Sequence, residues 1–184
     1  MKILVINGPN LNLLGSRDQD MYGATTLDQI EVQLTQRARD IGIDILFFQS
    51  NSEGSIIDHI QEVSGYINGI IINPGALTHY GISLRDALSD TNLPVIEVHI
   101  SNIYARETWR HNSYVAPISV GQISGLGWRG YLFALNFLDS HDSAMLRSPV
   151  VVIFKLSYDP KNILTGCPII STMAASSVKV SLYS

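Results

Sequence analysis

Two ionisable side chains stand two residues apart in the segment VIEVHISN. Glu97 and His99 lie in an apolar run that predicts a strand over residues 94–100, so both side chains project from the same face. A carboxylate beside an imidazole stabilises the protonated ring and fixes its orientation. Such a histidine is suited to general acid catalysis near neutral pH. A structural ion pair at the rim of a sheet would show the same spacing.

Two other segments carry side chains that suit an anionic or hydroxylated ligand. In NPGALTH, Asn73 and His79 flank a Pro-Gly turn at Gly75, and such a turn exposes backbone NH groups. In ARETWRH, Arg106 and Arg110 are four residues apart, which predicts one helical face with two guanidinium groups for a carboxylate or phosphate. Ordinary turn chemistry and a solvated helix face are the alternatives.

The segment GSRDQDMYGATT places Tyr22 five residues after Arg17 and just before a predicted helix. A phenol is a poor base at neutral pH because its pKa is about 10. A cation on the same short loop would stabilise the phenolate and make it a usable base. The pair is therefore a candidate base with its activator, and a surface tyrosine is the alternative.

The segment GLGWRG matches the GxGxxG pattern of dinucleotide-binding loops. The acidic residue that this fold needs about 20 residues further on would fall in the apolar run PVVVIF. We therefore favour glycines that allow a helix and a strand to pack closely. A nucleotide-binding module without catalytic activity is the alternative.

A metal site is a further possibility that the sequence leaves open. His79, Glu97 and His99 could supply two imidazoles and a carboxylate, as in metal-dependent hydrolases. The nearby arginines would repel a cation, so we expect no metal and no other cofactor.

Apolar runs alternate with amphipathic segments along the chain. Strands are predicted at residues 2–7, 43–49, 69–73, 94–100 and 119–124, and helices at residues 25–42, 55–65, 81–90, 105–111 and 130–138. This alternation predicts an α/β fold, a flavodoxin-like three-layer sandwich with a five-stranded parallel sheet. Ligands of such sheets bind at the carboxyl ends of the strands, a rule that gives four candidate site segments: Asn7–Gly15, Asn51–Gly54, Asn73–His79 and Glu97–Arg106.

Composition limits the class of protein. The chain has 184 residues, 46% of them hydrophobic, and a net charge of −4, which is typical of a globular protein and unlike a nucleic-acid-binding one. The single cysteine, Cys167, cannot form an internal disulfide, and no apolar run is long enough for a membrane helix. We expect a soluble cytoplasmic protein that contacts neither nucleic acid nor membrane.

Charge and composition change near Ser140, which predicts a catalytic domain at residues 1–139 and a C-terminal extension of unknown role at residues 140–184.

Taken in order over residues 3–138, the motifs form a recognisable set. They are INGPNLNLLGSR, MYG, QSNSEG, INPGALTHY, LRDAL, IEVHISN, ARETWRH and GLGWRGY. This part of the chain closely resembles type II 3-dehydroquinate dehydratases. The resemblance implies a flavodoxin-like fold and metal-free anti elimination of water from 3-dehydroquinate, through an enolate, to give 3-dehydroshikimate. It also implies a homododecamer, a tetramer of trimers, that serves either aromatic biosynthesis or quinate breakdown.

The resemblance implies a catalytic role for five residues. Tyr22 would be the general base, and Arg17 would activate it and stabilise the charged intermediate. Asn10 would hold a water molecule at the enolate oxygen. His99, oriented by Glu97, would protonate the departing hydroxyl group.

The resemblance also implies a set of binding residues. The backbone of Ile100 and Ser101 would cradle the substrate carboxylate, and Arg110 would bind a substrate hydroxyl. Arg106 would help to place the active-site lid or Tyr22. The remaining expected contacts to substrate or to a neighbouring subunit are Asn73, Gly75, His79 and Asp86.

Two positions depart from the pattern of the resemblance. Asp18-Gln19 follows the loop arginine where relatives usually carry Glu-Pro, so we expect a looser lid because proline restricts the open state. Gly81 stands where serine or threonine is common, which removes one side-chain hydroxyl.

Overall fold

The computed structural model describes residues 1–16 and 23–140 of the chain. A five-stranded parallel sheet has the order β2-β1-β3-β4-β5, which is the flavodoxin-like order and confirms the predicted fold. Its strands are β1 (Lys2–Asn7), β2 (Asp44–Gln49), β3 (Gly69–Asn73), β4 (Val95–His99) and β5 (Gly121–Ser124). Apart from Ser140, the predicted C-terminal extension lies outside the described residues.

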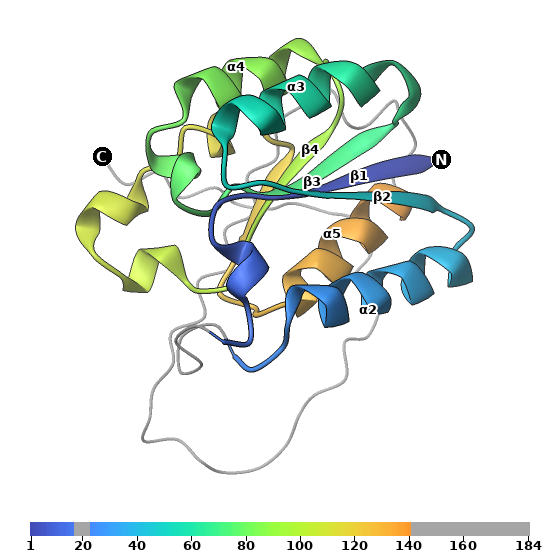
Figure 1. Ribbon diagram of the computed structural model, residues 1–184, viewed down its shortest axis with the longest axis horizontal. Coiled ribbons are helices and arrows are strands. Elements are labelled where there is room, and N and C mark those ends of the chain that lie inside the picture. Colours follow the sequence, from blue (N-terminus) through green and yellow to red (C-terminus); the bar gives the residue numbers. More distant parts are fainter. Residues whose placement is uncertain (17–22, 141–184) are drawn as a thin grey trace, which may run out of the picture. The chain divides into compact units, whose positions relative to one another are not determined.

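Helices cover both faces of the sheet (Figure 1). They are α2 (Leu27–Asp40), α3 (Glu53–Val63), α4 (Ile82–Asp90) and α5 (Arg129–Ser140). In Figure 1, α3 and α4 lie above the sheet, while α2 and α5 lie below it. Short 3-10 helices connect them: η1 (Leu11–Leu13), η2 (Ser64–Tyr66), η3 (Gly75–His79), η4 (Ile103–Ala105), η5 (Thr108–His111) and η6 (Ala116–Ile118).

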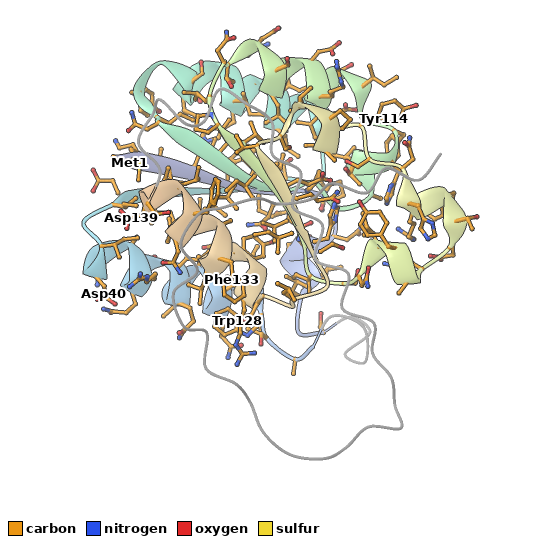
Figure 2. The ribbon with its side chains drawn as sticks, turned by 180° about the vertical axis from the view of Figure 1, so that it is seen from behind. Met1, Asp40, Tyr114, Trp128, Phe133 and Asp139 are labelled. Atoms are coloured by element: carbon orange, nitrogen blue, oxygen red, sulfur yellow. The ribbon has the colours of Figure 1, made fainter. Side chains whose placement is uncertain are left out.

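The alternation of side chains along each strand divides the core in two. In β1, Ile3 and Val5 join the apolar cluster between the sheet and helices α2 and α5. Leu4 and Ile6 join the cluster between the sheet and helices α3 and α4. Side chains of both clusters fill the space between sheet and helices (Figure 2). Burial of one such aliphatic side chain stabilises the fold by about 1.5–3 kcal/mol. This parity also decides which face a polar residue at a strand end takes.

The ends of the helices show the local signals that set their bounds. The predicted capping box of α2 is present, because Thr26 Oγ1 accepts from Gln29 N at 3.2 Å and Gln29 Oε1 accepts from Thr26 N at 3.0 Å. Gly42 ends the helix with a φ of 72°. Helix α3 begins two residues earlier than predicted, because Ser52 is its N-cap and accepts from Ser55 N.

One predicted element differs. The segment ARETWRH is not a continuous helical turn: η4 ends before Arg106, which is extended with φ −107° and ψ −163°, and η5 begins at Thr108. The expectation that Arg106 and Arg110 share one helical face is therefore wrong. Among residues 1–16 and 23–140, no helix is both long enough and apolar enough to span a bilayer.

Candidate active site

A cavity of about 260 Å³ lies at the carboxyl ends of β1, β3 and β4. Nine of the predicted site residues line it: Asn10, Asn73, Gly75, His79, His99, Ile100, Ser101, Arg106 and Arg110. These residues come from three separate loops, as expected for a parallel sheet with ligands at its carboxyl edge. Arg17 and Tyr22 lie outside the described residues.

The predicted pair on β4 is present. Ile96 and Val98 face the cluster under α5, so Glu97 and His99 face the opposite side of the sheet. His99 Nε2 and Glu97 Oε1 are 2.7 Å apart, and both side chains are buried. His99 lines the cavity while Glu97 lies beneath it, so the carboxylate orients the ring without lining the site itself.

The carboxylate of Glu97 is surrounded by hydrogen-bond donors. Thr78 Oγ1 donates to Oε1, Ser113 Oγ lies 2.9 Å from Oε2, and Gln122 Nε2 donates to Oε2 at 2.8 Å. Burial alone would raise the pKa of Glu97, but the hydrogen bond and charge of His99, with the bonds from Thr78 and Ser113, outweigh it and hold the pKa below its ordinary value. Glu97 is therefore ionised at neutral pH.

These contacts also bear on the metal alternative. His79, Glu97 and His99 do not form a metal-binding group, and the described ranges contain no cluster of three histidine, cysteine or acidic side chains placed to hold an ion. Both oxygens of Glu97 are already used by protein donors.

Asn10 lies in a strained loop that the neighbouring strand supports. Its φ is 68°, and its backbone NH donates to Asn51 Oδ1 at 2.8 Å. Gln49 Nε2 lies 3.2 Å from the same oxygen and 3.3 Å from Gly8 O. A Cβ on Gly8 would lie 2.5 Å from Pro74 O, so the loops after β1 and β3 touch through backbone. The QSN segment at the end of β2 thus holds the loop that presents Asn10.

Asn73 is the last residue of β3 and is held at both ends of its amide. Its Oδ1 accepts from Gly75 N at 3.1 Å, and its Nδ2 donates to Tyr131 Oη at 2.9 Å. Tyr131 in turn donates to Asn7 Oδ1 at 2.7 Å. Burial raises the pKa of Tyr131 above its usual range, so its hydroxyl stays protonated. Gly75 has a φ of 57°, which explains glycine at this turn.

His79 ends η3 and lines the cavity. Its Nδ1 lies 2.8 Å from Asn112 O, and because a carbonyl only accepts, Nδ1 carries the proton. Burial lowers the pKa of His79, and the positive charges of His99 and Arg110 lower it further against the opposing bond to Asn112. A neutral ring with Nδ1 protonated leaves Nε2 as an acceptor, suited to a ligand hydroxyl.

Glu107 brings the two arginines together without a shared helical face. Arg110 Nε donates to Glu107 Oε2 at 2.8 Å, and Arg106 Nε lies 3.4 Å from the same oxygen. The Arg110 guanidinium also lies 4.0 Å from the centre of the Trp109 ring. The Trp109 and His79 rings form a T-shaped pair with a centroid distance of 5.3 Å. One tryptophan therefore braces two residues of the cavity wall.

Asp86 is the one described candidate that lies apart. It is an exposed residue of α4 whose Oδ1 accepts from Arg85 Nη1 at 2.7 Å, and it does not line the cavity. Its contact with substrate or with a neighbouring subunit stays a prediction. Ile100 and Ser101 do line the cavity, and their carbonyl oxygens accept from Gly127 N and Ser124 Oγ.

Two glycines of GLGWRG, Gly125 and Gly130, allow close packing. A Cβ on Gly125 would lie 2.8 Å from Asn102 Cβ, and one on Gly130 would lie 3.1 Å from Val98 Cγ1. The Gly130 contact matches the favoured interpretation of the motif, a helix packed closely on a strand. Gly125 instead contacts the loop after β4, and a Cβ on Gly127 would meet nothing within 4 Å. Gly125 and Gly127 also border a second cavity of about 390 Å³, which shares Ile100, Ser101 and Arg106 with the first.

Several supporting residues were missed by sequence reasoning. They are Ser113, Gln122 and Tyr131. Asn51 and Thr78 lie in segments that were expected at the site, but no role was predicted for either of them. Gln122 carried a usable signal, because a polar side chain inside a short predicted strand needs a buried partner. Tyr131 carried a weaker one, since a buried tyrosine usually finds a partner for its hydroxyl.

Comparison with known proteins identifies the family. A sequence model described as Dehydroquinase class II matches residues 1–139. The chain belongs to the class II dehydroquinase family. Among curated relatives, the 3-dehydroquinate dehydratase of Roseiflexus castenholzii is 57% identical over 138 residues, 75% of this chain and 88% of that protein. The 3-dehydroquinate dehydratase of Bacillus subtilis is 50% identical over 144 residues, 78% of this chain and 97% of that protein.

Solved structures of class II dehydroquinases agree. The type II dehydroquinase from Butyrivibrio crossotus has a TM-score of 0.75 and 46% identity, covering 76% of this chain and 98% of its own. The type II dehydroquinase from Propionibacterium acnes has a TM-score of 0.74 and 43% identity, covering 76% and 97%. The family resemblance found in the sequence motifs is therefore confirmed.

Proposed function

We propose that this class II dehydroquinase removes water from 3-dehydroquinate to give 3-dehydroshikimate. The observation that carries the proposal is the buried Glu97–His99 pair, which opens into a cavity of about 260 Å³ together with Asn73 and two arginines. A fixed imidazole beside groups that bind hydroxyls and carboxylates suits elimination from a polyhydroxylated acid. The curated relatives carry the name of this activity.

The first step of the proposed reaction is removal of the proton beside the ketone. Tyr22, as a phenolate stabilised by Arg17, takes that proton and leaves an enolate. Positive charge and hydrogen-bond donors must gather where the enolate forms, and no metal ion supplies them in this proposal. Asn10 contributes by holding the water molecule that contacts the enolate oxygen.

The second step is loss of the hydroxyl group. His99 donates a proton to the departing oxygen, the carbon–oxygen bond breaks, and the enolate collapses to the enone. Because Nε2 of His99 contacts Glu97, Nδ1 is the ring nitrogen that serves the substrate. Base and acid come from loops after different strands, which suits removal of proton and hydroxyl from opposite faces, an anti elimination.

The remaining cavity residues bind substrate in this proposal. The backbone of Ile100 and Ser101 cradles the carboxylate, and Arg110 contacts a hydroxyl. Arg106 helps to place the lid that carries Tyr22. Further hydroxyl contacts come from Asn73, Gly75 and His79. Asp86, which lies away from the cavity within one chain, contacts a neighbouring subunit.

The wider setting follows from the same proposal. We place the reaction in residues 1–139 of a cytoplasmic homododecamer built from four trimers, in either aromatic biosynthesis or quinate breakdown. Residues 140–184 form an extension outside the reaction. The mass of the full chain, compared with that of a chain ending at His141, tests the assembly. Both proteins should have a mass of twelve chains. A particle of fewer than twelve copies of the shorter chain contradicts the dodecamer.

Turnover tests the reaction directly. Addition of 3-dehydroquinate should produce the absorbance of the conjugated enone, with the same rate in the presence of a chelator. Tyr22→Phe should abolish turnover while calorimetry still detects substrate binding. Tyr66→Phe is the matched control, because Tyr66 lies exposed in η2, before β3 and at the opposite end of the sheet from the cavity. Full activity of Tyr22→Phe would exclude it as the base, and no enone from the wild type would exclude the reaction.

A further inference from the structure

The hydroxyl of Tyr131 joins the ends of two neighbouring strands. Asn7 and Asn73 are the last residues of β1 and β3, and the register of the two strands pairs them directly. Both asparagines lie an even number of residues from Ile3, Val5 or Ile71 on the same strand, so their side chains point to the same face of the sheet, toward α2 and α5. Tyr131 enters the same cluster from α5 and is fully buried. Its hydroxyl bonds both asparagines, at 2.7 and 2.9 Å.

A backbone NH group fixes the directions of the hydrogen bonds that join Gly75, Asn73 and Tyr131. Gly75 N can only donate, so the amide atom of Asn73 that faces it must be Oδ1. Nδ2 of Asn73 must then face the hydroxyl of Tyr131, which accepts. The hydroxyl proton is left to point at Asn7 Oδ1. One hydroxyl therefore acts as acceptor and donor at once, and reversal of the Asn73 amide would place its two N–H donors against the NH of Gly75.

These bonds leave Asn73 with a defined capacity for a ligand. An asparagine amide offers two N–H donors and two acceptor sites on its oxygen. Gly75 N and Tyr131 Oη take one of each, so one donor and one acceptor site remain at the cavity wall. A substrate hydroxyl can use both, because it accepts and donates.

We infer that Tyr131 is a positioning residue for the reaction, which acts by fixing the amide of Asn73 towards a substrate hydroxyl. The inference rests on the proposed function, since it assigns a support to a residue of that site. Tyr131 lies behind Asn73 in the core and does not line the cavity, so it does not contact substrate itself. Its effect on turnover must pass through Asn73.

A kinetic double-mutant cycle separates this role from a purely structural one. Tyr131→Phe keeps the ring and removes only the hydroxyl. It should lower kcat/KM about three- to tenfold, mainly through a higher KM, because one neutral hydrogen bond is the support that is lost. In the Asn73→Ala background the same change should alter kcat/KM less than twofold, since the residue through which Tyr131 acts is gone.

A buried hydroxyl elsewhere provides the control. Ser119 is as well buried as Asn73, and its Oγ donates to Val115 O at 3.0 Å. Neither Ser119 nor Val115 lines the cavity. Ser119→Ala should lower the melting temperature as removal of a buried hydrogen bond does, with kcat/KM unchanged. Tyr131→Phe should lower both quantities.

The outcomes distinguish this inference from the proposed function. If the wild type forms enone but Tyr131→Phe keeps the wild-type kcat/KM, the positioning role is refuted and the reaction stands. An equal loss in the wild-type and Asn73→Ala backgrounds also refutes it. If the wild type forms no enone, the reaction fails, and the same cycle run on the Kd for 3-dehydroquinate decides the role of Tyr131. Should Tyr131→Phe fail to fold, Asn7→Ala removes the acceptor of the hydroxyl proton and should produce a smaller change of the same sign.

Discussion

Replacement of Glu97 by glutamine removes a charge from the buried support of His99 while keeping the shape of the side chain. The carboxylate accepts every hydrogen bond it makes, from His99, Thr78, Ser113 and Gln122. An amide must present two N–H donors on one side. In either orientation, the NH2 group of the glutamine in Glu97→Gln faces at least one of those donors. The neutral amide also no longer stabilises a positive imidazole.

The size of the effect follows from the contact between Glu97 and His99. The two side chains meet at 2.7 Å and both are buried, so solvent screens them little. Hydrogen bonds to charged groups contribute about 1.5–3 kcal/mol. If that stabilisation is used in the transition state, its loss lowers the rate by about 10- to 150-fold. Most of the fall should appear in kcat, because Glu97 does not line the cavity.

The assay is enone formation from 3-dehydroquinate at saturating and limiting substrate. The chain offers a matched control on its surface, where His59 Nδ1 and Glu62 Oε2 are 3.4 Å apart and the Glu62 side chain is 74% exposed. Glu62→Gln makes the same chemical change to a Glu–His pair in water. Such exposed pairs contribute little, so kcat should stay within twofold of the wild type.

Two results would refute this reasoning. A folded Glu97→Gln enzyme with the kcat of Glu62→Gln would show that His99 needs no buried carboxylate. A raised KM with unchanged kcat would show that the pair serves binding and not proton transfer.

Three further predictions test other parts of the site. Gly8→Ala should lower the denaturant midpoint by the equivalent of about 1–3 kcal/mol, because the new Cβ would lie 2.5 Å from the rigid carbonyl of Pro74; an unchanged midpoint would contradict the close backbone contact. Trp109→Leu should raise KM about two- to fivefold by removing the ring under the Arg110 guanidinium, since an exposed cation–π contact contributes about 0.5–1 kcal/mol; the Kd from calorimetry should rise equally. The pKa of Glu97 is lower in the folded protein than its ordinary value, so the ionised carboxylate contributes stability above pH 4.5 that is lost as the pH falls through the folded pKa. The difference in unfolding free energy between wild type and Glu97→Gln should therefore shrink below pH 4.5. A difference that grows there would reverse the assigned direction of the pKa shift.

The sheet could be predicted because its signals are local. GIIIN and VIEVH are short apolar runs bounded by turn residues, and each became a strand in the expected place. Thr26 and Gln29 of the capping box are only three positions apart, so this signal was equally readable. The segment from Arg106 to Arg110 was not, because two 3-10 helices and one α-helical turn share the same residue preferences.

The cavity could be predicted only in part, for a related reason. The rule that parallel strands end at one edge brings the loops after β1, β3 and β4 together, and that rule needs no side-chain detail. Which donors complete the carboxylate of Glu97 depends on contacts between segments far apart in the chain. Gln122 is 25 residues away and Thr78 is 19 residues away, and no periodicity links them.

The supports share one arrangement, which ties catalysis to folding. His99, Asn73 and Asn10 each line the cavity, and each is fixed by a residue that does not line it: Glu97, Tyr131 and Asn51. Because these contacts form when the chain folds, the cost in conformational entropy of ordering the site is met before substrate arrives, and substrate binding need not supply it. It follows that changes in the supporting residues should lower stability and turnover together, whereas changes confined to the cavity wall should lower turnover alone.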